Sequence, residues 1–391
     1  MAIPLKYNIR NLYVRKVTTG LTVLGIGLVV AVFLSVMSLS EGLTRVFKAS
    51  GSDKNIIVLR RNSQSEVDSG IYRHQVPLII TLPGIERDKD GLPLVSQELV
   101  VILNMEKISG GTANVTLRGI SEKGPFLRPQ FNLIEGRMFK PGLSEVIVSR
   151  SLSKRFKNCR LGNIIHFGSY QWKVVGIFDA GGTAPDSEIW TDVEGAMNDL
   201  KRANYSSVLV RTTDKPARDQ FIGDLVNDPR LSLQGKPERD YYKKQTSTAD
   251  PIKFFGVFIG IIMAIGASFG AMNTMYATVS ARTKEIATLR VLGFSHLSIL
   301  TSFIIESLLL AFLGGVLGCI LGFLAVNLAL SGVTGTANFY TFSEVVFAFR
   351  LTPSTLLTGI IFSLFIGFFG GILPATQAAF TKIILALRQV E

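Results

Sequence analysis

The sequence contains few of the residues that form disulfides and metal sites: two cysteines and three histidines among 391 residues. Cys319 lies inside a long apolar stretch, whereas Cys159 lies in a region rich in charge. We therefore expect them on different sides of a membrane boundary, where no disulfide can join them. The cysteines and histidines do not cluster in the sequence, so it predicts no metal site.

Motifs for nucleotide binding and nucleophilic catalysis are also missing. Gly235-Lys236 is followed by Pro237 and lacks the first glycine of a phosphate-binding loop at the required spacing. Residues 330–332, Leu-Ser-Gly, resemble the start of an ATPase signature, but they fall at the predicted outer end of a membrane helix. No G-x-S-x-G elbow occurs, and no nucleophile motif accompanies the histidines, which are His74, His166 and His296. We expect a chain with no catalytic residues and no cofactor of its own.

Charge is absent from several long stretches, in a chain that is 47% hydrophobic. Residues 18–40, 254–281 and 351–381 contain no charged residue, and residues 297–331 contain only Glu306. A soluble helix needs a polar face, whereas ~20 apolar helical residues span the bilayer core of about 30 Å. The predicted transmembrane helices are 18–40, 251–280, 297–331 and 351–380. The first is too long for the apolar core of a cleaved signal peptide, so we expect a retained signal anchor.

Basic residues set the predicted orientation. Residues 1–17 contain several basic residues and no acid, and the segment 281–296 contains Arg282, Lys284 and Arg290 against Glu285. Short loops rich in lysine and arginine stay in the cytoplasm. We therefore expect a multi-pass protein of the inner (cytoplasmic) membrane with both termini in the cytoplasm. The net charge of +12 forms no basic stripe with interleaved aromatics, so nucleic acid is not an expected partner.

The predicted fold class is an α-helical membrane protein with four transmembrane helices and an α+β extracytoplasmic domain inserted between helices 1 and 2. The other predicted segments are a cytoplasmic N-terminus at 1–17, the extracytoplasmic domain at 41–250, a cytoplasmic segment at 281–296, an extracytoplasmic loop at 332–350 and a cytoplasmic tail at 381–391.

The inserted region contains short β-branched runs typical of strands and two segments with helical spacing. The predicted strands are 55–59, 99–103, 115–117, 145–148, 163–167, 172–178 and 208–211. The predicted helices are 149–156 and 217–227. Glycine and proline mark turns between these elements. The pattern leaves open whether the domain is divided into two lobes. The polar residues 241–248 lead directly into the second apolar stretch and favour a helical stalk outside the membrane.

The chain resembles the MacB/FtsX permease superfamily of ABC proteins. The membrane part carries the resemblance in Gly270–Asn273, Arg282–Gly293, Phe303–Ser307, Gly314–Gly318, Gly370–Ala375, Ala378-Ala379 and Leu385–Arg388. The inserted region is similar to the periplasmic core domain of that family in Glu135–Arg137, Glu145–Ser149, Gly162 and Trp172–Ile177. Ala287-Thr288 departs from the glycine-containing step expected after Glu285-Ile286. The fused N-terminal ATPase of MacB is missing, which implies a separate ATPase subunit.

The resemblance implies that residues 282–292 form a coupling helix that docks into the ATPase. The spacing of Ile286, Leu289 and Leu292 indicates one shared apolar face. The alternative is an interfacial helix whose basic residues meet anionic lipid. The residues expected to couple to the ATPase are Arg282, Lys284, Glu285, Ile286, Leu289, Arg290, Leu292 and Gly293.

Glu306 is the charge predicted inside the membrane. It either orients the cytoplasmic end of the third helix or pairs with a basic neighbour such as Arg290 or a lysine. Four-residue spacing places small residues on one face of the same helix, where backbones can approach closely. These are Gly314, Gly318 and Gly322. Pro374, in the fourth helix, is expected to kink or end it.

The leading hypothesis is the permease subunit of an ATP-driven ABC complex. It would transmit ATPase motion to its outer domain, to export or extract a lipoprotein, peptide, glycolipid or drug. The resemblance implies several partners: an ABC ATPase that holds ATP-Mg, a second permease copy, membrane lipids and, in some members, a periplasmic adaptor protein. The alternative is an FtsX-like membrane regulator of an extracytoplasmic hydrolase. Sparse intramembrane charge disfavours a third class, a self-contained carrier or receptor.

Overall fold

The computed structural model describes residues 10, 16–329, 334–338 and 340–381. These residues divide into two compact units. The helical unit draws its residues from 1–41, 251–332 and 349–391, and the sheet unit draws its residues from 42–250 and 333–348. The Leu-Ser-Gly motif at 330–332 and the tail from residue 382 lie outside the described residues.

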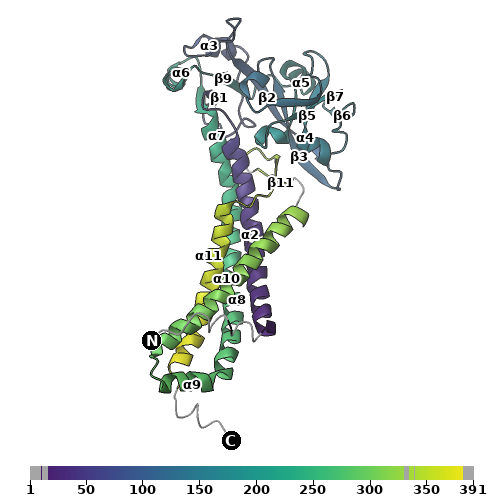
Figure 1. Cartoon of the computed structure of the whole chain (residues 1–391). Coiled ribbons are helices and arrows are strands. Elements are labelled where there is room, and N and C mark those ends of the chain that lie inside the picture. Colours follow the sequence, from purple (N-terminus) through teal and green to yellow (C-terminus); the bar gives the residue numbers. More distant parts are fainter. Residues whose placement is uncertain (1–9, 11–15, 330–333, 339, 382–391) are drawn as a thin grey trace. The chain divides into compact units, whose positions relative to one another are not determined.

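Four long helices carry the apolar stretches, as predicted. They are α2 (Lys16–Ala49), α8 (Asp250–Ala281), α10 (His296–Leu324) and α11 (Pro353–Ala379), and each is long and apolar enough to cross a membrane (Figure 1). Ser295 caps α10 by accepting a hydrogen bond from the Ser298 amide, and Thr352 caps α11 in the same way. A π-helical turn, η4 (Ala325–Ala329), follows α10.

The sheet unit contains one mixed ten-stranded sheet. Its strands are β1 (Asn55–Arg60), β2 (Val95–Glu106), β3 (Thr112–Ile120), β4 (Asn132–Gly136), β5 (Glu145–Ser149), β6 (Ile164–Phe167), β7 (Tyr170–Asp179), β8 (Glu188–Asp192), β9 (Ser207–Arg211) and β10 (Leu233–Pro237). The order is β10-β1-β9-β2-β3-β8-β5-β7-β4, with β6 beside β7. The pairs β3/β8 and β5/β7 are parallel, and the others are antiparallel.

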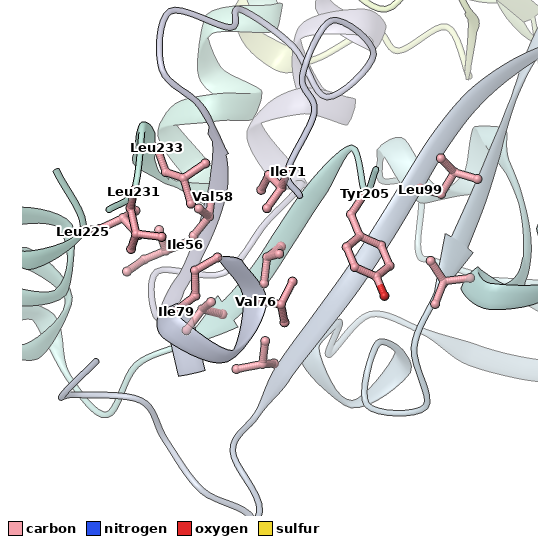
Figure 2. Close-up of a cluster of buried hydrophobic side chains, with 14 of the residues drawn as sticks. Ile56, Val58, Ile71, Val76, Ile79, Leu99, Tyr205, Leu225, Leu231 and Leu233 are labelled. Carbon is pink, nitrogen blue, oxygen red and sulfur yellow. The ribbon is translucent and has the colours of Figure 1, made fainter. Parts of the chain in front are cut away.

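Short helices accompany this sheet and help to form separate apolar cores. They are α3 (Gln75–Thr81), α4 (Arg150–Arg155), α5 (Val193–Asp199), α6 (Lys215–Asn227) and α7 (Glu238–Gln245), with the 3-10 turns η1 (Pro125–Leu127), η2 (Ala184–Ser187) and η3 (Thr246–Ala249). Figure 2 shows one core, in which Ile56 and Val58 of β1 lie with Ile79 of α3 and Leu225 of α6. Other cores lie around Trp172 and around Trp190. One continuous sheet carries these cores.

The predicted strands and helices of this domain all form, but several elements were not predicted. β4, β8 and β10 are short and carry charged or glycine residues, and α3 contains a proline. The segment 332–350, predicted as a loop, contains the antiparallel hairpin β11 (Thr334–Ala337) and β12 (Glu344–Phe347). Val346 of β12 belongs to the core around Trp172. This segment is therefore part of the domain's fold.

The predicted stalk is helical: residues Glu238–Ala281 form one helical run through α7, η3 and α8. Its first turns do not stand free in solvent, since Tyr241 and Tyr242 are buried. Asn338, at the end of the hairpin strand β11, donates to Gln245 and accepts from Thr248. The polar residues that suggested a stalk therefore form the attachment of α7 to the sheet unit.

Candidate functional site

The segment expected to couple to an ATPase forms a short helix, α9 (Thr283–Val291), between α8 and α10. Ile286 is buried in an apolar cluster with Val279 of α8, Phe303 of α10 and Ala378 of α11. One side of α9 is thus packed on the ends of three long helices. Lys284 on the helix is exposed.

The three apolar residues expected on one face have different environments. Ile286 is buried, Leu289 is half-buried, and Leu292, just after the helix, is 67% exposed. Val291 and Leu297 are also exposed. Ile286, the first residue of the pattern, therefore belongs to the core of the helix bundle. The apolar side chains in and beside the turn between α9 and α10 are exposed instead.

A buried ion pair joins the start of α9 to α10. Arg282 Nη1 donates to Glu306 Oε2 at 2.8 Å, and the two side chains are only 6% and 5% exposed. Arg282 Nε also donates to Glu285 at 3.2 Å, and its guanidinium lies 5.1 Å from the ring centroid of Phe303. Buried charges need such partners because desolvation disfavours them. This pairing fixes the position of α9 on the bundle.

The turn after α9 is closed by hydrogen bonds of a Schellman motif. The Gly293 amide donates to Arg290 O, and the Phe294 amide donates to Leu289 O. Gly293 has φ of +93°, a conformation that glycine adopts without strain. Arg290 Nη1 donates to the Phe294 carbonyl at 2.9 Å, and its Nη2 lies 2.8 Å from His296 Nε2. Arg290, named above as a candidate partner of Glu306, instead holds this turn.

The predicted glycine face of α10 lies against α2. A Cβ at Gly318 would meet Val30 Cβ at 2.6 Å, and one at Gly314 would meet Ile26 Cβ at 2.8 Å. At Gly322 the approach is looser, with Leu34 Cβ at 3.5 Å. Pro374 is buried inside α11 and does not end it, since the helix continues to Ala379.

Substitution of Gly318 by alanine is expected to destabilise the bundle by about 1–3 kcal/mol, because the added methyl overpacks the contact with Val30. Gly266→Ala is the matched control: a Cβ there meets nothing within 4 Å, and alanine favours the helix by about 1 kcal/mol. Unfolding in denaturing detergent, followed by circular dichroism, measures both. Equal stability of the two variants would contradict close packing at Gly318.

The sheet unit holds a second constellation, a buried charge cluster centred on Arg118. Its guanidinium donates to Glu66, Glu98 and Glu188 at 2.7–3.0 Å. Glu98 also accepts from Arg128 at 2.7 and 2.8 Å. Burial alone raises the pKa of Glu98, but Arg128 and Arg118 outweigh it and lower that pKa below its ordinary value.

This charge cluster connects the sheet to α7. The Glu66 amide donates to Tyr241 Oη, and Glu238 of α7 accepts from the Asn55 side chain and the Ser52 amide. Sequence reasoning missed it because its members are far apart along the chain and none belongs to a motif. Within the cluster Ser207 Oγ also donates to Glu66 at 2.6 Å.

The chain matches two family models in sequence. One, described as the MacB-like periplasmic core domain, matches residues 19–227, and the other, the FtsX-like permease C-terminal region, matches residues 257–383.

Individual proteins are similar over nearly the whole chain. The macrolide export ATP-binding/permease protein MacB of Bdellovibrio bacteriovorus is 24% identical over 97% of this chain and 60% of its own length. The uncharacterized ABC transporter permease YknZ of Bacillus subtilis is 24% identical over 95% of both chains. The crystal structure of the periplasmic region of MacB from Actinobacillus actinomycetemcomitans matches 49% of this chain and 91% of that one, at 13% identity and a TM-score of 0.37. The chain thus spans about three fifths of the MacB relative and nearly all of YknZ.

The first model alone covers more than half of the sequence. The residues that the two models match include, in chain order, most of an apolar helix, a mixed α/β domain and three more apolar helices. The chain belongs to the MacB/FtsX family of ABC transporter permeases.

Proposed function

We propose that this permease is a non-catalytic subunit of an export complex in the inner membrane, with ATP-Mg bound and hydrolysed by a separate ABC ATPase. A second permease copy completes the membrane part. The similarity to YknZ over 95% of both chains supports a permease that works without a fused ATPase. Both termini and α9 lie in the cytoplasm, because their flanking segments are basic.

The observation that carries this proposal is the attachment of α9. The Arg282–Glu306 pair and the closed turn at Gly293 hold α9 against the ends of α8, α10 and α11. A force applied to α9 is then passed to the long helices, since the intervening contacts are packed and hydrogen-bonded. The exposed Val291 and Leu292 offer an apolar surface to an ATPase.

The long helices transmit this force to the extracytoplasmic domain. α8 is continuous with α7, which is tied into the sheet unit by Glu238 and Tyr241. We infer that ATP-driven motion reaches the outer domain through this helical run, where it acts on a substrate already outside the membrane. Residues 19–227 match the family model of the MacB-like periplasmic core domain. This match favours a role in export over a role as an FtsX-like regulator of a hydrolase.

Leu292→Arg is expected to reduce stimulation of the partner ATPase by about tenfold or more, because it places a charge in the centre of an apolar contact. Leu292 tests docking better than Leu289, since an exposed side chain can be changed without unfolding α9. ATPase rates of the reconstituted complex, with and without the permease, measure the effect.

The matched control is Leu143→Arg, an equally simple change of an exposed leucine in the sheet unit. It is expected to leave stimulation unchanged. Full stimulation with Leu292→Arg would show that α9 does not dock through this turn, and the interfacial lipid-bound helix would then be the better account.

A further inference from the structure

The second half of β2 is open on the side that faces away from β3. On that side β2 pairs with β9 only over Val95–Glu98. The Ser206 hydroxyl then bonds to the amide and the carbonyl of Val100. The next backbone bond on this side, among the described residues, is at Glu106, whose carbonyl accepts from the Lys157 amide. The edge between these two points has no neighbouring strand.

The backbone groups along this open edge belong to alternate residues, because successive residues of a strand bond to opposite sides. Val100 and Glu106 both bond on the open side, and the register of β2 with β3 does not shift between them. The amide and carbonyl groups of Ile102 and Asn104 therefore point to the same side. In the part of the chain that the structure describes, neither residue has a backbone partner there.

β6 offers a second open edge, since it pairs with β7 alone. The carbonyl of Asn163, just before β6, accepts from the Val174 amide of β7. By the same alternation, Ile165 bonds toward β7, whereas Ile164 and His166 point away from it. No backbone partner for these last two residues occurs within the described ranges of the chain. Unpaired rows of this kind are templates for another strand.

Both open edges border one groove of about 490 Å³. It is lined by residues 102–106 of β2, by residues 165–167 of β6 and by residues 157–158, which precede β6. Leu103 and Met105 pack against the core around Trp172 but are only half-buried. Asn104 and His166, which alternate with the core-facing residues, are exposed. The groove thus combines apolar side chains with backbone donors and acceptors from two strands.

The other edges of this sheet are poorer templates for strand addition. β10 contains Gly235 and ends at Pro237. β4 has a shift of register between Leu133 and Glu135. Proline, glycine and bulges weaken pairing at an edge. The regular, proline-free course of β2 beside this groove is therefore the edge best suited to pairing with another chain.

We propose that this groove binds an extended segment of a partner polypeptide by β-strand addition. The amide and carbonyl groups of the segment bond to the open edges of β2 and β6. Every second side chain of the segment is apolar and covers Leu103 and Met105, since side chains of a strand alternate between its two faces. The segment carries no large net charge, because Glu106 and Lys157 at the groove already pair with each other at 2.8 Å. This binding does not depend on the ATPase partnership.

The test uses the full chain in nanodiscs that hold single copies, and three fluorescent peptides as probes. Each peptide has threonine at odd positions of a seven-residue core, and valine, leucine or phenylalanine at all even positions. Fluorescence polarisation, with empty nanodiscs as the blank, is expected to show binding of at least one peptide. Methylation of two backbone nitrogens in that peptide should weaken binding about tenfold or more, because it removes hydrogen bonds and keeps every side chain.

Hydrogen exchange followed by mass spectrometry locates the bound peptide. Slower exchange is expected in residues 101–106 and in residues 163–167, with no change in β4 or β10. Asn104→Pro removes an amide that points out of an edge, where proline is tolerated, and should weaken binding about tenfold. Asn104→Thr keeps that amide and is the matched control, with binding nearly unchanged. Tryptophan fluorescence shows whether both variants keep the folded sheet unit.

Several results would overturn the proposal: no binding by any of the three peptides, equal binding after nitrogen methylation, or protection from exchange outside both edges. Protection of both edges without peptide, in nanodiscs that hold two copies but not in those that hold one, would overturn it as well. That result would show that a second copy of the chain covers the groove. No ATPase takes part, so failure here is distinct from failure of the Leu292 test.

Discussion

Glu306→Leu is expected to destabilise the helical unit by about 3–5 kcal/mol, because it removes the buried partner of Arg282 while the guanidinium stays in an apolar setting. A second carboxylate that pairs with this guanidinium, that of Glu285, is itself largely exposed. Unfolding of the full chain in denaturing detergent, followed by far-ultraviolet circular dichroism, measures the change. The same variant should lose ATPase stimulation, since α9 is no longer fixed on α10.

A double variant distinguishes the cost of removing one charge of the ion pair from the net contribution of the whole pair to stability. Arg282→Met combined with Glu306→Leu replaces both charges with apolar groups, and such replacements of buried pairs are often neutral or stabilising. We expect it to recover most of the lost stability. As a control, Lys157→Met removes an exposed pair with Glu106 and should leave stability nearly unchanged. A Glu306→Leu protein as stable as wild type would contradict the role of the pair.

Arg118→Met is expected to destabilise the sheet unit by about 3–5 kcal/mol, because three buried carboxylates lose a shared cation. Both tryptophans of the chain, Trp172 and Trp190, lie in this unit. Trp190 Nε1 even donates to Glu188 at 2.7 Å. Tryptophan fluorescence during urea unfolding therefore reports on this unit within the full chain.

The loss of stability that Arg118→Met causes, relative to wild type, should become smaller as the pH falls from 7 toward 5. In the variant, burial raises the pKa of the abandoned carboxylates, so protonation relieves their repulsion at lower pH. In the wild type the pKa of Glu98 is lowered, so its contribution is present near neutral pH and is lost on acidification. Arg230→Met removes the pair between a largely exposed guanidinium and Asp228, and should change stability far less than Arg118→Met does. A large deficit that does not change with pH would contradict this account of the cluster.

The membrane helices could be predicted because lipid excludes charge over a full span, a signal that needs no tertiary information. Their ends were less certain. α2 continues past the predicted boundary at residue 40 to Ala49, through residues that include Glu41, Arg45 and Lys48. Helix formation does not stop where hydrophobicity does. A hydropathy pattern therefore indicates where a span lies and only approximately where its helix ends.

Within the sheet unit, the long β-branched strands were predictable, and the short polar ones were not. β8 has acidic residues at both ends, and the first, Glu188, is buried because Arg118 of the neighbouring strand pairs with it. Likewise, the hairpin strand β12 begins at Glu344, which pairs with Lys107 at 2.7 Å and with Arg155. Such strands are stabilised by partners distant in sequence, which no local pattern reveals.

At the candidate site, the sequence was sufficient to place a helix at 282–292 and a buried charge at Glu306. It did not select Arg282 over Arg290 as the partner of that charge. The choice depends on tertiary geometry, since Arg290 is occupied by the Phe294 carbonyl and His296. The docking role of this segment stays a prediction, and so do the roles of its individual residues.

The most direct test of the account is purification of the full chain from its native membranes in mild detergent, with quantification of the proteins that accompany it. The account predicts an ABC ATPase at about one copy per permease, and loss of that ATPase from the Leu292→Arg protein but not from Leu143→Arg. Repeated recovery without an ATPase, under conditions that keep other membrane complexes intact, would contradict the claim that this permease is driven by a separate ATPase subunit.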